Sequence, residues 1–545
     1  MQPSTLAKRV WLLLFLTVII FYFYGLGHIP FVGPDEPRYA QVAREMFLRG
    51  ALITPTLGGH TWFEKPALLY WMMIGSFSLF GVSEWAARLG PAVSGLLTSA
   101  AVYWVGKRAE VRTSDSEQSG LGAWSSLICA STAGIIVFSR GASFDIVVTM
   151  TVTWALSFYL VTDWEENARR RRSLLVGFYI FVGLSLLAKG LVGIVIPFGV
   201  IGGYYILRRE LPPRQTLWSL FWGLPLTVAV AATWYGPVIA QHGWTFIDQF
   251  FIQHHFERYL SNKYHHPQPV YFYPLMIMML TLPWSAFLIE GIMESRNWRW
   301  RAESPMDRFR VFAFAWILVP LIFFSMSGSK LPGYILPVLP AVALIAGERI
   351  ARLSNKRQTA SLAMRVTGAI FLLFAIGGIV FSRLSGDLTT QCALTIAAPV
   401  ICAGAFALFF PHVTRVAAIL IAATLVAFVV MLNCGVAGFA QRDSDRDLIQ
   451  RADARGYGSV PVYFLHQISR TAEFYAAGRI AYGPDGEPVR FEGPSEVANA
   501  VRQGDGVALV MVPVEYLRQL TELRTLKTEV IADNGEIAIV AVSLQ

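Results

Sequence analysis

Long runs of apolar residues alternate with short polar connectors along most of this chain. Most runs are about 20 residues long, the length that an α-helix needs to cross a hydrocarbon core of about 30 Å. The run at 173–207 is long enough for two helices and breaks at Lys189-Gly190, so we expect a helical hairpin there. The pattern therefore predicts a polytopic α-helical membrane protein. The runs lie near residues 10–27, 66–81, 86–106, 119–138, 144–162, 173–207, 216–238, 271–292, 309–326, 334–349, 363–383, 390–409 and 413–434.

The distribution of Lys and Arg indicates which runs cross the membrane, because cytoplasmic connectors carry an excess of these residues. All the basic connectors fall on one side of the membrane only if the run at 66–81 does not cross it. We therefore expect that run to form a juxtamembrane or re-entrant helix and about 13 helices to cross, with the N-terminus inside and the C-terminus outside. The basic connectors are Lys8-Arg9, 106–112, 166–172, 208–214, 296–301 and 352–357.

The composition agrees with a membrane protein. Of the 545 residues, 54% are hydrophobic and 15% are charged, and the net charge is +9. Basic cytoplasmic connectors account for this surplus, so it does not indicate a nucleic-acid partner. All four cysteines lie in apolar runs, and we expect small buried hydrophobic residues rather than a disulfide set or a metal site. They are Cys129, Cys392, Cys402 and Cys434.

The pattern changes after residue 438. Residues 447–458 are typical of a helix with a glycine stop, and short strands are predicted at 460–465, 506–512 and 537–542. We therefore predict a membrane domain, 1–438, and a small α/β domain, 439–545, on the outer side. No catalytic signature is evident in 439–545, so we expect this domain to support or cover the site. The outward juxtamembrane loops of the membrane domain are predicted at 28–81, 239–270 and 327–334.

Acidic residues are scarce on the outer side and therefore informative. Asp35 and Glu36 stand between two prolines in the segment GPDEPRYA, at the start of the first outward loop. A single carboxylate there could cap the following helix. Two carboxylates in succession at the membrane face indicate a functional site. Asp145 opens an apolar run, where a helix cap and a functional role are equally good interpretations.

Eight outward basic residues do not follow the cytoplasmic bias, and five of them are site candidates. The remaining three are Arg44, Arg49 and Lys263, and snorkelling toward lipid headgroups is the favoured explanation for Arg44 and Arg49. Lys65 and Lys330 each lie between Gly or Pro turns and aromatic residues at the membrane edge, where an unused charge is costly. Lys and Arg in such places suit the phosphate of a lipid-linked substrate. The other site candidates are Arg38, Arg140 and Arg258.

A metal site is a weaker prediction. His265 and His266 are adjacent on the second outward loop, and with Glu64 they could bind a divalent metal such as Zn²⁺. A second pair, His254-His255, makes the first pair less distinctive. A polar surface loop is the alternative interpretation.

The segments GPDEPRYAQVAREM, FEKPALLYW, SRGASFD and SGSKLPGYILPVLP resemble the bacterial 4-amino-4-deoxy-L-arabinose lipid A transferases. These enzymes belong to the C-type glycosyltransferase superfamily, which also includes the more distant protein O-mannosyltransferases. The resemblance covers the whole chain and implies that fold, with an α/β domain in the periplasm and the membrane part in the bacterial inner membrane. It implies inverting transfer of aminoarabinose from undecaprenyl phosphate to a lipid A phosphate, and hence polymyxin resistance.

The resemblance also implies roles for single residues. Asp35, Glu36 and Asp145 match the family's acidic positions and are the candidate catalytic residues. Lys65 matches the lysine of the family's EKPP motif, although this chain has EKPA. Lys330 and Tyr334 match its SKLPxYxLP loop. With Arg38, Arg140 and Arg258, they complete the candidate substrate-binding set.

The charge of the acceptor decides what the carboxylates must do. A phosphate acceptor is already largely anionic near pH 7, its second pKa being about 6, and needs no strong general base. Asp35 or Asp145 would then hold the cationic 4-amino group or stabilise the transition state. A Ser or Thr hydroxyl acceptor would require Asp35 to take its proton. The residues alone leave both roles open.

Two alternatives to this function remain. A protein O-mannosyltransferase would share the fold and modify secreted proteins. A transporter is less compatible with the chain, because transporters place ionisable residues in the middle of spans and show internal repeats. Here the charges cluster at one face, and Lys189 is interpreted as part of a hairpin turn.

Overall fold

The structure is a computed structural model, and by its internal contacts the chain divides into two units. The first unit comprises Met1–Tyr24, Phe63–Leu69 and Arg88–Met431, and the second comprises Gly25–Trp62, Tyr70–Ala87 and Leu432–Gln545. Each unit is described by itself. The residues that the structure describes are 5–113, 116–257, 268–301, 304–356, 361–385, 388–504, 506–523 and 525–545.

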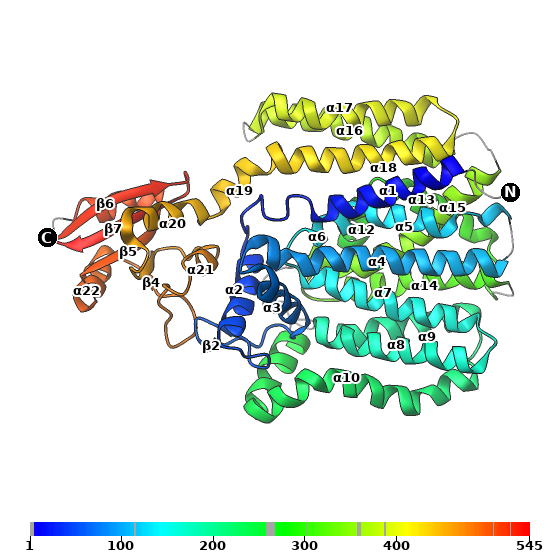
Figure 1. Cartoon of the computed structure of the whole chain (residues 1–545), viewed down its shortest axis with the longest axis horizontal. Coiled ribbons are helices and arrows are strands. Elements are labelled where there is room, and N and C mark those ends of the chain that lie inside the picture. Colours follow the sequence, from blue (N-terminus) through cyan, green and yellow to red (C-terminus); the bar gives the residue numbers. More distant parts are fainter. Residues whose placement is uncertain are drawn as a thin grey trace. The chain divides into compact units, whose positions relative to one another are not determined.

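The first unit is a bundle of apolar helices (Figure 1). Within the described ranges, nine helices are long and apolar enough to cross a membrane, or up to eleven if two bent pairs each count as one span. The predicted 13 is reached if the shorter helices α1 (Thr5–Phe23) and α9 (Val192–Arg208) also cross. The nine are α4 (Glu84–Thr113), α7 (Phe144–Asp163), α8 (Ala168–Lys189), α10 (Arg214–Phe246, continued by η2, Ile247–Glu257), α14 (Pro305–Ser325), α15 (Leu339–Asn355, preceded by η4, Pro332–Val338), α16 (Leu362–Ser385), α17 (Thr390–Phe409) and α18 (Val413–Val430).

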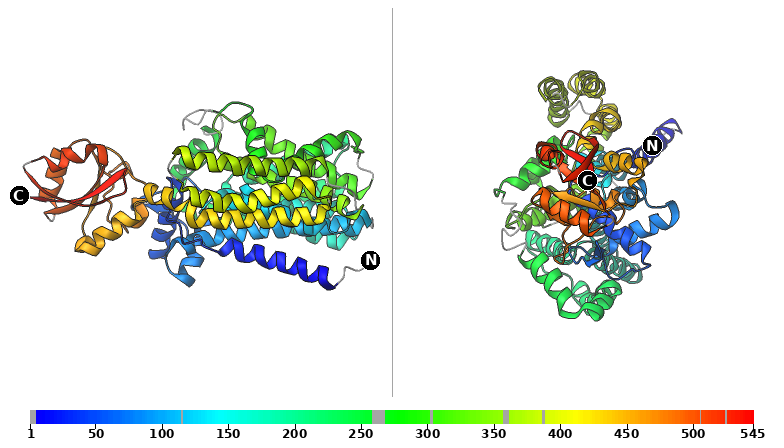
Figure 2. Two further views of the ribbon diagram at one scale, coloured as in Figure 1. Left: turned by 90° about the horizontal axis from the view of Figure 1, so that it is seen from above. Right: turned by 90° about the vertical axis from the view of Figure 1, so that its left-hand side faces the viewer.

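The predicted hairpin forms between α8 and α9. Helix α8 ends at Lys189, and Gly190 turns the chain with φ 66° before α9 begins. The two helices approach so closely that a Cβ on Gly193 would lie 2.3 Å from the Ser185 backbone, so glycine is required there. Neighbouring helices of this unit, such as α16, α17 and α18, likewise pack side by side (Figure 2).

Helix α3 (Leu68–Phe80) corresponds to the run that was not expected to cross. Its 13 residues extend over about 20 Å at 1.5 Å per residue, which is less than the hydrocarbon thickness. This length agrees with the juxtamembrane interpretation. The second outward loop, by contrast, is largely helical: α10 and η2 continue to Glu257.

Two runs that looked like continuous spans are broken. Helices α5 (Leu121–Ser131) and α6 (Ala133–Ser139) meet at 59°, and α12 (Phe272–Leu280) and α13 (Ser285–Glu294) form a second pair bent by 117°. At the two breaks, polar groups of one helix pair form hydrogen bonds with polar groups of the other pair. The Ala133 N–H donates to the Leu282 carbonyl at 2.9 Å, and the Trp284 indole N–H donates to Ser131 Oγ at 3.1 Å. Such pairing allows non-helical backbone at membrane depth.

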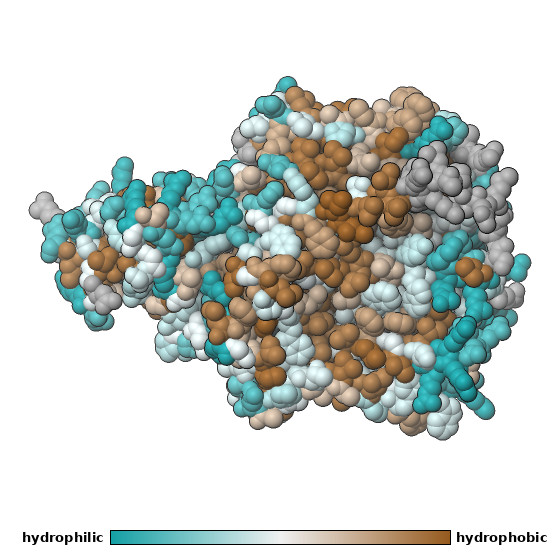
Figure 3. All heavy atoms as spheres, viewed as in Figure 1, coloured by the Kyte–Doolittle hydropathy of each residue, from teal (hydrophilic) through white to brown (hydrophobic). Residues whose placement is uncertain are grey.

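One group of charged residues in the first unit joins α13, α14 and α15. Glu348, whose side chain is 2% exposed, pairs with Arg310 at 2.5 Å, while Arg349 and Arg352 pair with Glu294 at 2.5 and 2.6 Å. These helix ends adjoin the basic connectors predicted to be cytoplasmic. Hydrophobic side chains cover the sides of the helices (Figure 3), as a lipid-facing surface requires.

The second unit contains a five-stranded mixed sheet in the order β4-β3-β5-β7-β6. Strands β3, β5 and β7 were predicted, and β4 and β6 were not. Helices cover both faces of the sheet, as expected from the nearly continuous apolar character of β5 and β7. The elements are β3 (Val462–Leu465), β4 (Arg490–Phe491), β5 (Val507–Pro513), β6 (Leu526–Asp533) and β7 (Ile537–Leu544), with α20 (Arg446–Ala452) and α21 (Ala472–Tyr475) on one face and α22 (Pro494–Gln503) and α23 (Leu517–Thr521) on the other.

The first outward loop also belongs to the second unit. It contains the expected amphipathic helix, α2 (Asp35–Leu48), followed by a hairpin of β1 (Thr56–Leu57) and β2 (His60–Thr61). The Glu45 carboxylate accepts hydrogen bonds from Thr56 Oγ1 at 2.6 Å and from the Gly58 N–H at 2.7 Å. This carboxylate therefore ties the hairpin turn to α2.

The cysteine prediction is wrong for three of the four residues. Cys392 and Cys434 are disulfide-bonded. Cys392 lies in the first turn of α17, and Cys434 lies in η5 (Met431–Gly435), directly after α18. Cys402 is a free but exposed thiol, and only Cys129 is free and buried as expected. Nothing in the apolar runs around Cys392 and Cys434 indicates that these residues are disulfide-bonded.

Candidate functional site

A buried ion pair joins the start of α7 to the end of α8. The Ser143 hydroxyl caps α7 by accepting the N–H of Asp145 at 3.1 Å. The Asp145 carboxylate is therefore not the helix cap, and it forms an ion pair with the Lys189 ammonium. The two side chains are only 20% and 17% exposed. At this burial, each charge depends on the other.

The segment η4 closes over this ion pair. Lys189 Nζ lies 4.3 Å from the centroid of the Tyr334 ring, within range of a cation–π interaction. A Cβ on Gly333 would lie 2.0 Å from Asp145 Oδ2, so only glycine allows the backbone to pass. Asp145, Lys189 and Tyr334 thus form one cluster from three elements, which we call the 145–189–334 cluster.

Lys330 lies two residues before the start of η4, and its side chain is buried. Its ammonium group donates to the Gln268 carbonyl at 3.0 Å and to the Ser327 carbonyl at 2.7 Å. Within the described ranges, no carboxylate pairs with it. A buried cation held by neutral carbonyls retains a full charge for an anionic ligand.

Lys65 is also mostly buried. It pairs with Glu64 at 2.5 Å, and the two side chains are 14% and 15% exposed. The preceding residue, Phe63, packs against the rings of His242 and Phe246 at centroid distances of 5.0 and 5.1 Å. Aromatic packing against α10 therefore fixes the place of this ion pair.

Arg140 has a different environment from the other predicted substrate-binding residues. Its guanidinium donates to the Phe21 carbonyl at 2.9 Å and to the Tyr24 carbonyl, and it lies 5.4 Å from the Phe21 ring. Its hydrogen bonds therefore satisfy carbonyls at the C-terminal end of α1. This arrangement favours a structural role.

In the second unit, Asp35 and Glu36 occupy the first turn of α2. Asp35 pairs with Arg38 at 2.9 Å but keeps 57% of its side chain exposed. Arg38 also donates to the Pro34 carbonyl at 2.8 Å and lies 5.5 Å from the Trp62 ring. Arg38 is thus fixed on three sides, and the Asp35 carboxylate remains accessible.

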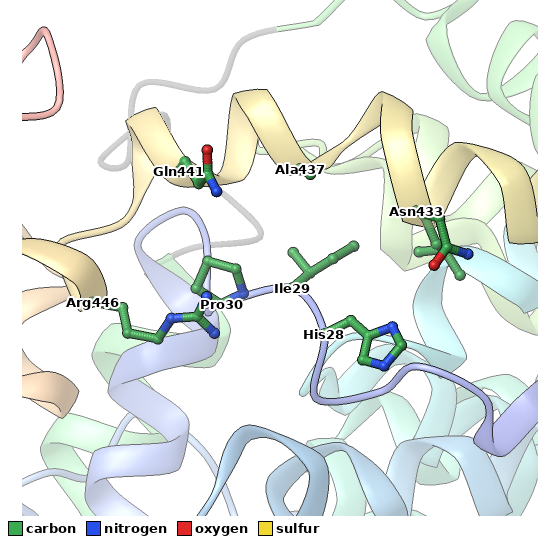
Figure 4. Close-up of a pocket in the computed structure, with 8 residues that line it drawn as sticks. His28, Ile29, Pro30, Asn433, Ala437, Gln441 and Arg446 are labelled. Atoms are coloured by element: carbon green, nitrogen blue, oxygen red, sulfur yellow. The ribbon is translucent and has the colours of Figure 1, made fainter. Parts of the chain in front are cut away.

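A cavity of about 120 Å³ opens in the second unit beside this loop (Figure 4). Its one Arg, Arg446, contacts Glu84 at 3.5 Å and Asp447 at 3.4 Å. Because nearby carboxylates balance this charge, the cavity does not select an anionic ligand by charge alone. The lining residues are His28, Ile29, Pro30, Leu432, Asn433, Ala437, Gln441 and Arg446.

Three predicted residues lie outside the described ranges: Arg258, His265 and His266. Their predicted roles stay predictions. Within the described ranges, no group of three His, Cys, Asp or Glu residues could hold a metal ion. Glu64, the third predicted metal ligand, pairs with Lys65 instead.

Lys189 is the residue that sequence reasoning missed. It was interpreted as part of a turn because the α8–α9 run breaks beside it. A lone lysine within a 35-residue apolar block is nevertheless costly in a membrane, and such a residue is by default a functional candidate. That rule, applied to Lys189, would have suggested a carboxylate partner.

The sequence is similar to one protein-family model and to curated proteins whose names describe sugar transfer. Residues 9–247 match a family model described as dolichyl-phosphate-mannose-protein mannosyltransferase. Two curated relatives are undecaprenyl phosphate-α-4-amino-4-deoxy-L-arabinose arabinosyl transferases. The one from Yersinia enterocolitica is 31% identical over 348 residues, covering 63% of this chain and 59% of the relative. The one from Pseudomonas paraeruginosa is 29% identical over 381 residues, covering 68% and 64%. The chain thus spans less than two thirds of these relatives' length.

Two solved structures share the arrangement of helices and sheet. The crystal structure of ArnT from Cupriavidus metallidurans bound to undecaprenyl phosphate superimposes with a TM-score of 0.79, at 23% identity, over 98% of each chain. The archaeal oligosaccharyltransferase AglB from Archaeoglobus fulgidus gives a TM-score of 0.50, at 13% identity, over 94% of this chain and 70% of its own. These likenesses concern the fold.

The burial of the Asp145–Lys189 pair generates a stability prediction. Asp145→Asn or Lys189→Met removes one partner of this mostly buried pair and should cost about 2–3 kcal/mol, because the loss of one partner destabilises such a pair strongly. The double variant should be more stable than the sum of the two losses predicts. Unfolding of the detergent-solubilised protein measures all three free energies.

The surface pair Lys107–Glu110, in which Lys107 is 49% exposed, provides the matched control. Lys107→Met and Glu110→Gln should show a coupling of no more than about 0.5 kcal/mol. Equal couplings in the two cycles would contradict the buried pairing of Asp145 and Lys189.

Proposed function

We propose that the chain transfers 4-amino-4-deoxy-L-arabinose from undecaprenyl phosphate to phosphate groups of lipid A. Its C-type glycosyltransferase fold and its similarity to the curated aminoarabinose transferases support this proposal. The observation that carries the proposal is the sequence similarity to relatives that share this activity name, which extends over 63% and 68% of the chain. Through this modification the chain would give resistance to polymyxin and cationic antimicrobial peptides.

The proposed chemistry is an inverting displacement. An oxygen of the lipid A phosphate attacks the anomeric carbon, and the bond from that carbon to the undecaprenyl phosphate oxygen breaks, leaving undecaprenyl phosphate. Charge develops on the leaving phosphate, and the cations Lys65, Lys330 and Arg38 are suited to stabilise it. The anionic acceptor needs no strong base. The buried ammonium of Lys330, held only by carbonyls within the described ranges, supports this assignment.

We assign different roles to the two aspartates. Asp35 is 57% exposed, so its carboxylate can receive the cationic 4-amino group of the sugar. The negative charge of Asp145 is neutralised by the Lys189 ammonium. Asp145 therefore presents a net negative charge to the substrate only if this pair separates when substrate binds. Glu36 would support Asp35, and Arg258 and Tyr334 would help to bind the lipid phosphate and the sugar.

A protein O-mannosyltransferase is the second candidate. The match of residues 9–247 to the mannosyltransferase family model favours it. The acceptor distinguishes the two functions, because a mannosyltransferase would modify secreted proteins and leave the mass of lipid A unchanged.

Expression in a polymyxin-sensitive host that lacks its own transferase tests the proposed function. The intact chain should add the mass of aminoarabinose to lipid A, and Asp35→Asn or Lys65→Ala should abolish both this mass shift and polymyxin protection. Loss of one charge-stabilising contact costs about a hundredfold or more in such reactions. Mass spectrometry of lipid A is the measurement.

The exposed residues Glu515 and Lys527 provide matched controls in the second unit. Glu515→Gln and Lys527→Ala should retain the mass shift at equal expression. Full modification by Asp35→Asn and Lys65→Ala would refute the assigned roles, and unmodified lipid A with the intact chain would refute the function.

A divalent metal such as Zn²⁺ remains part of the proposal. Glu64, His265 and His266 would hold it, and the ion would supply further positive charge for phosphates. Since Glu64 pairs with Lys65 at 2.5 Å, metal binding must compete with that ammonium group. If a metal is required, dialysis against EDTA should reduce transfer at least tenfold and Zn²⁺ should restore it. Transfer that EDTA leaves unchanged would exclude the requirement.

The chain is a multi-pass membrane protein, and we propose that it lies in the bacterial inner membrane with residues 28–62 and 432–545 in the periplasm. The disulfide-bonded state of Cys392 and Cys434 supports this orientation, because disulfides persist in the periplasm and not in the cytosol. The basic connectors fit the opposite, cytoplasmic side.

The orientation predicts the number of free thiols. Denatured chain from inner membranes should react with a thiol reagent at Cys129 and Cys402 only, and at all four cysteines after reduction. Alkaline phosphatase fused after Gln545 should be active, because it requires the periplasm. Four reactive thiols without reduction, or an inactive fusion, would contradict this orientation.

A further inference from the structure

The chain just before Asp35 is held by side chains from the C-terminal part of the second unit. The N–H of Phe31 donates to the Tyr475 hydroxyl at 2.7 Å, and the N–H of Gly33 donates to Asp443 Oδ2 at 2.6 Å. Gly33 has φ 66°, which favours glycine. These two hydrogen bonds define the path along which the chain enters α2.

The Tyr475 hydroxyl has a second hydrogen bond, in which it acts as the donor. It donates to Glu84 Oε1 at 3.0 Å while accepting from Phe31, and Arg446 lies 3.5 Å from the same Glu84 oxygen. One hydroxyl therefore links the loop before α2, the start of α4 and α21. Because both of its hydrogen bonds are directional, the hydroxyl has one preferred position.

At the start of α2, Arg38 bonds to Asp35 and to the Pro34 carbonyl. The N-cap residue of this helix, Pro34, makes no side-chain cap hydrogen bond. A helix start without a side-chain cap frays more easily, since a good cap contributes about 1 kcal/mol. The contacts of Tyr475 and Asp443 are made to Phe31 and Gly33, and so they hold the segment that leads into this turn.

Helix α21 contacts the first loop directly through Phe474 and Tyr475, and Glu473 is linked to it through Tyr482. Phe474 packs its ring edge-on against Phe31 at 4.7 Å and lies 4.7 Å from the Arg44 guanidinium. Glu473 accepts a hydrogen bond from Tyr482, whose ring occupies the place of a Cβ on Gly58. Burial lowers the pKa of Arg44 to about 10. The first loop and α21 thus share one packed core.

We propose that Tyr475 is a positioning residue for transfer: its hydroxyl fixes Phe31 against Glu84 and thereby sets the place of Asp35 and Arg38. Tyr475 does not touch substrate in this proposal. The inference deepens the proposed function and rests on it for the role of Asp35. It also gives residues 432–545 a specific task beyond covering the site, namely holding the first loop in its working conformation.

Tyr475→Phe tests the inference, because it removes both hydrogen bonds and keeps the ring against Phe31 and Phe474. Tyr457→Phe is the matched control: it removes one hydroxyl of the same unit, which bonds only to Glu529 at 3.0 Å in the described chain. Transfer to lipid A in detergent micelles gives kcat and KM for both variants.

We expect Tyr475→Phe to lower kcat about fivefold to tenfold with KM changed less than twofold. A misplaced Arg38 loses its contact with charge that develops on the leaving phosphate only in the transition state, so kcat falls more than donor binding does. Tyr457→Phe should match the intact chain in both constants. Equal kcat for the two variants, or a loss confined to KM, would overturn the inference. A fall in the melting temperature of Tyr475→Phe that accounts for the loss through unfolded protein would also overturn it.

Hydrogen exchange makes the test independent of the reaction. In Tyr475→Phe, amides at 31–38 should exchange faster than in the intact chain and in Tyr457→Phe, while amides of β5 and β7 stay unchanged. Unchanged exchange at 31–38 would refute the positioning role. Faster exchange together with unmodified lipid A for the intact chain would support positioning and refute the proposed function alone.

Discussion

Polar groups in this chain must find partners within the protein wherever lipid excludes water. This constraint explains why the two broken helix pairs meet at their breaks, where the Ala133 amide bonds to the Leu282 carbonyl. It also explains why Asp145 and Lys189 are found together and why the Lys330 ammonium is surrounded by carbonyls. The charged groups of the candidate site in the first unit are therefore paired because lipid excludes water. The same pairing stabilises the fold, and a charged substrate can compete for it.

The ion pair in the 145–189–334 cluster stabilises the fold, and its two residues can exchange partners when a charged ligand binds. An ion pair that is one fifth exposed is costly to break without a replacement. In the proposed transfer, the donor's phosphate would replace Asp145 beside Lys189, and the cationic sugar would replace Lys189 beside Asp145. Gly333 keeps the backbone of η4 against the carboxylate, so exchange of partners need not move the helices.

Much of the architecture follows from the sequence, because apolar length and basic connectors are strong local signals. The α8–α9 hairpin, the short α3 and the central strands β3, β5 and β7 were all predictable in this way. The breaks after Ser131 and Leu280 were not, since the hydrogen bonds that permit them come from the other broken helix. Strand β6 was missed because its polar residues suit an edge strand. Lys189 and the disulfide-bonded cysteines depend on partners distant in sequence, which periodicity does not reveal.

The hydrogen bonds to the segment before α2 have a consequence for how such proteins diverge. Because residues 443 and 475 hold the segment that leads into α2, residues 25–62 and 432–545 depend on each other although they lie far apart in the sequence. A chimera that exchanges only the C-terminal part between relatives would separate these two segments. Exchange of both segments together would keep the loop intact, so substitutions in one segment should be accompanied by compensating substitutions in the other.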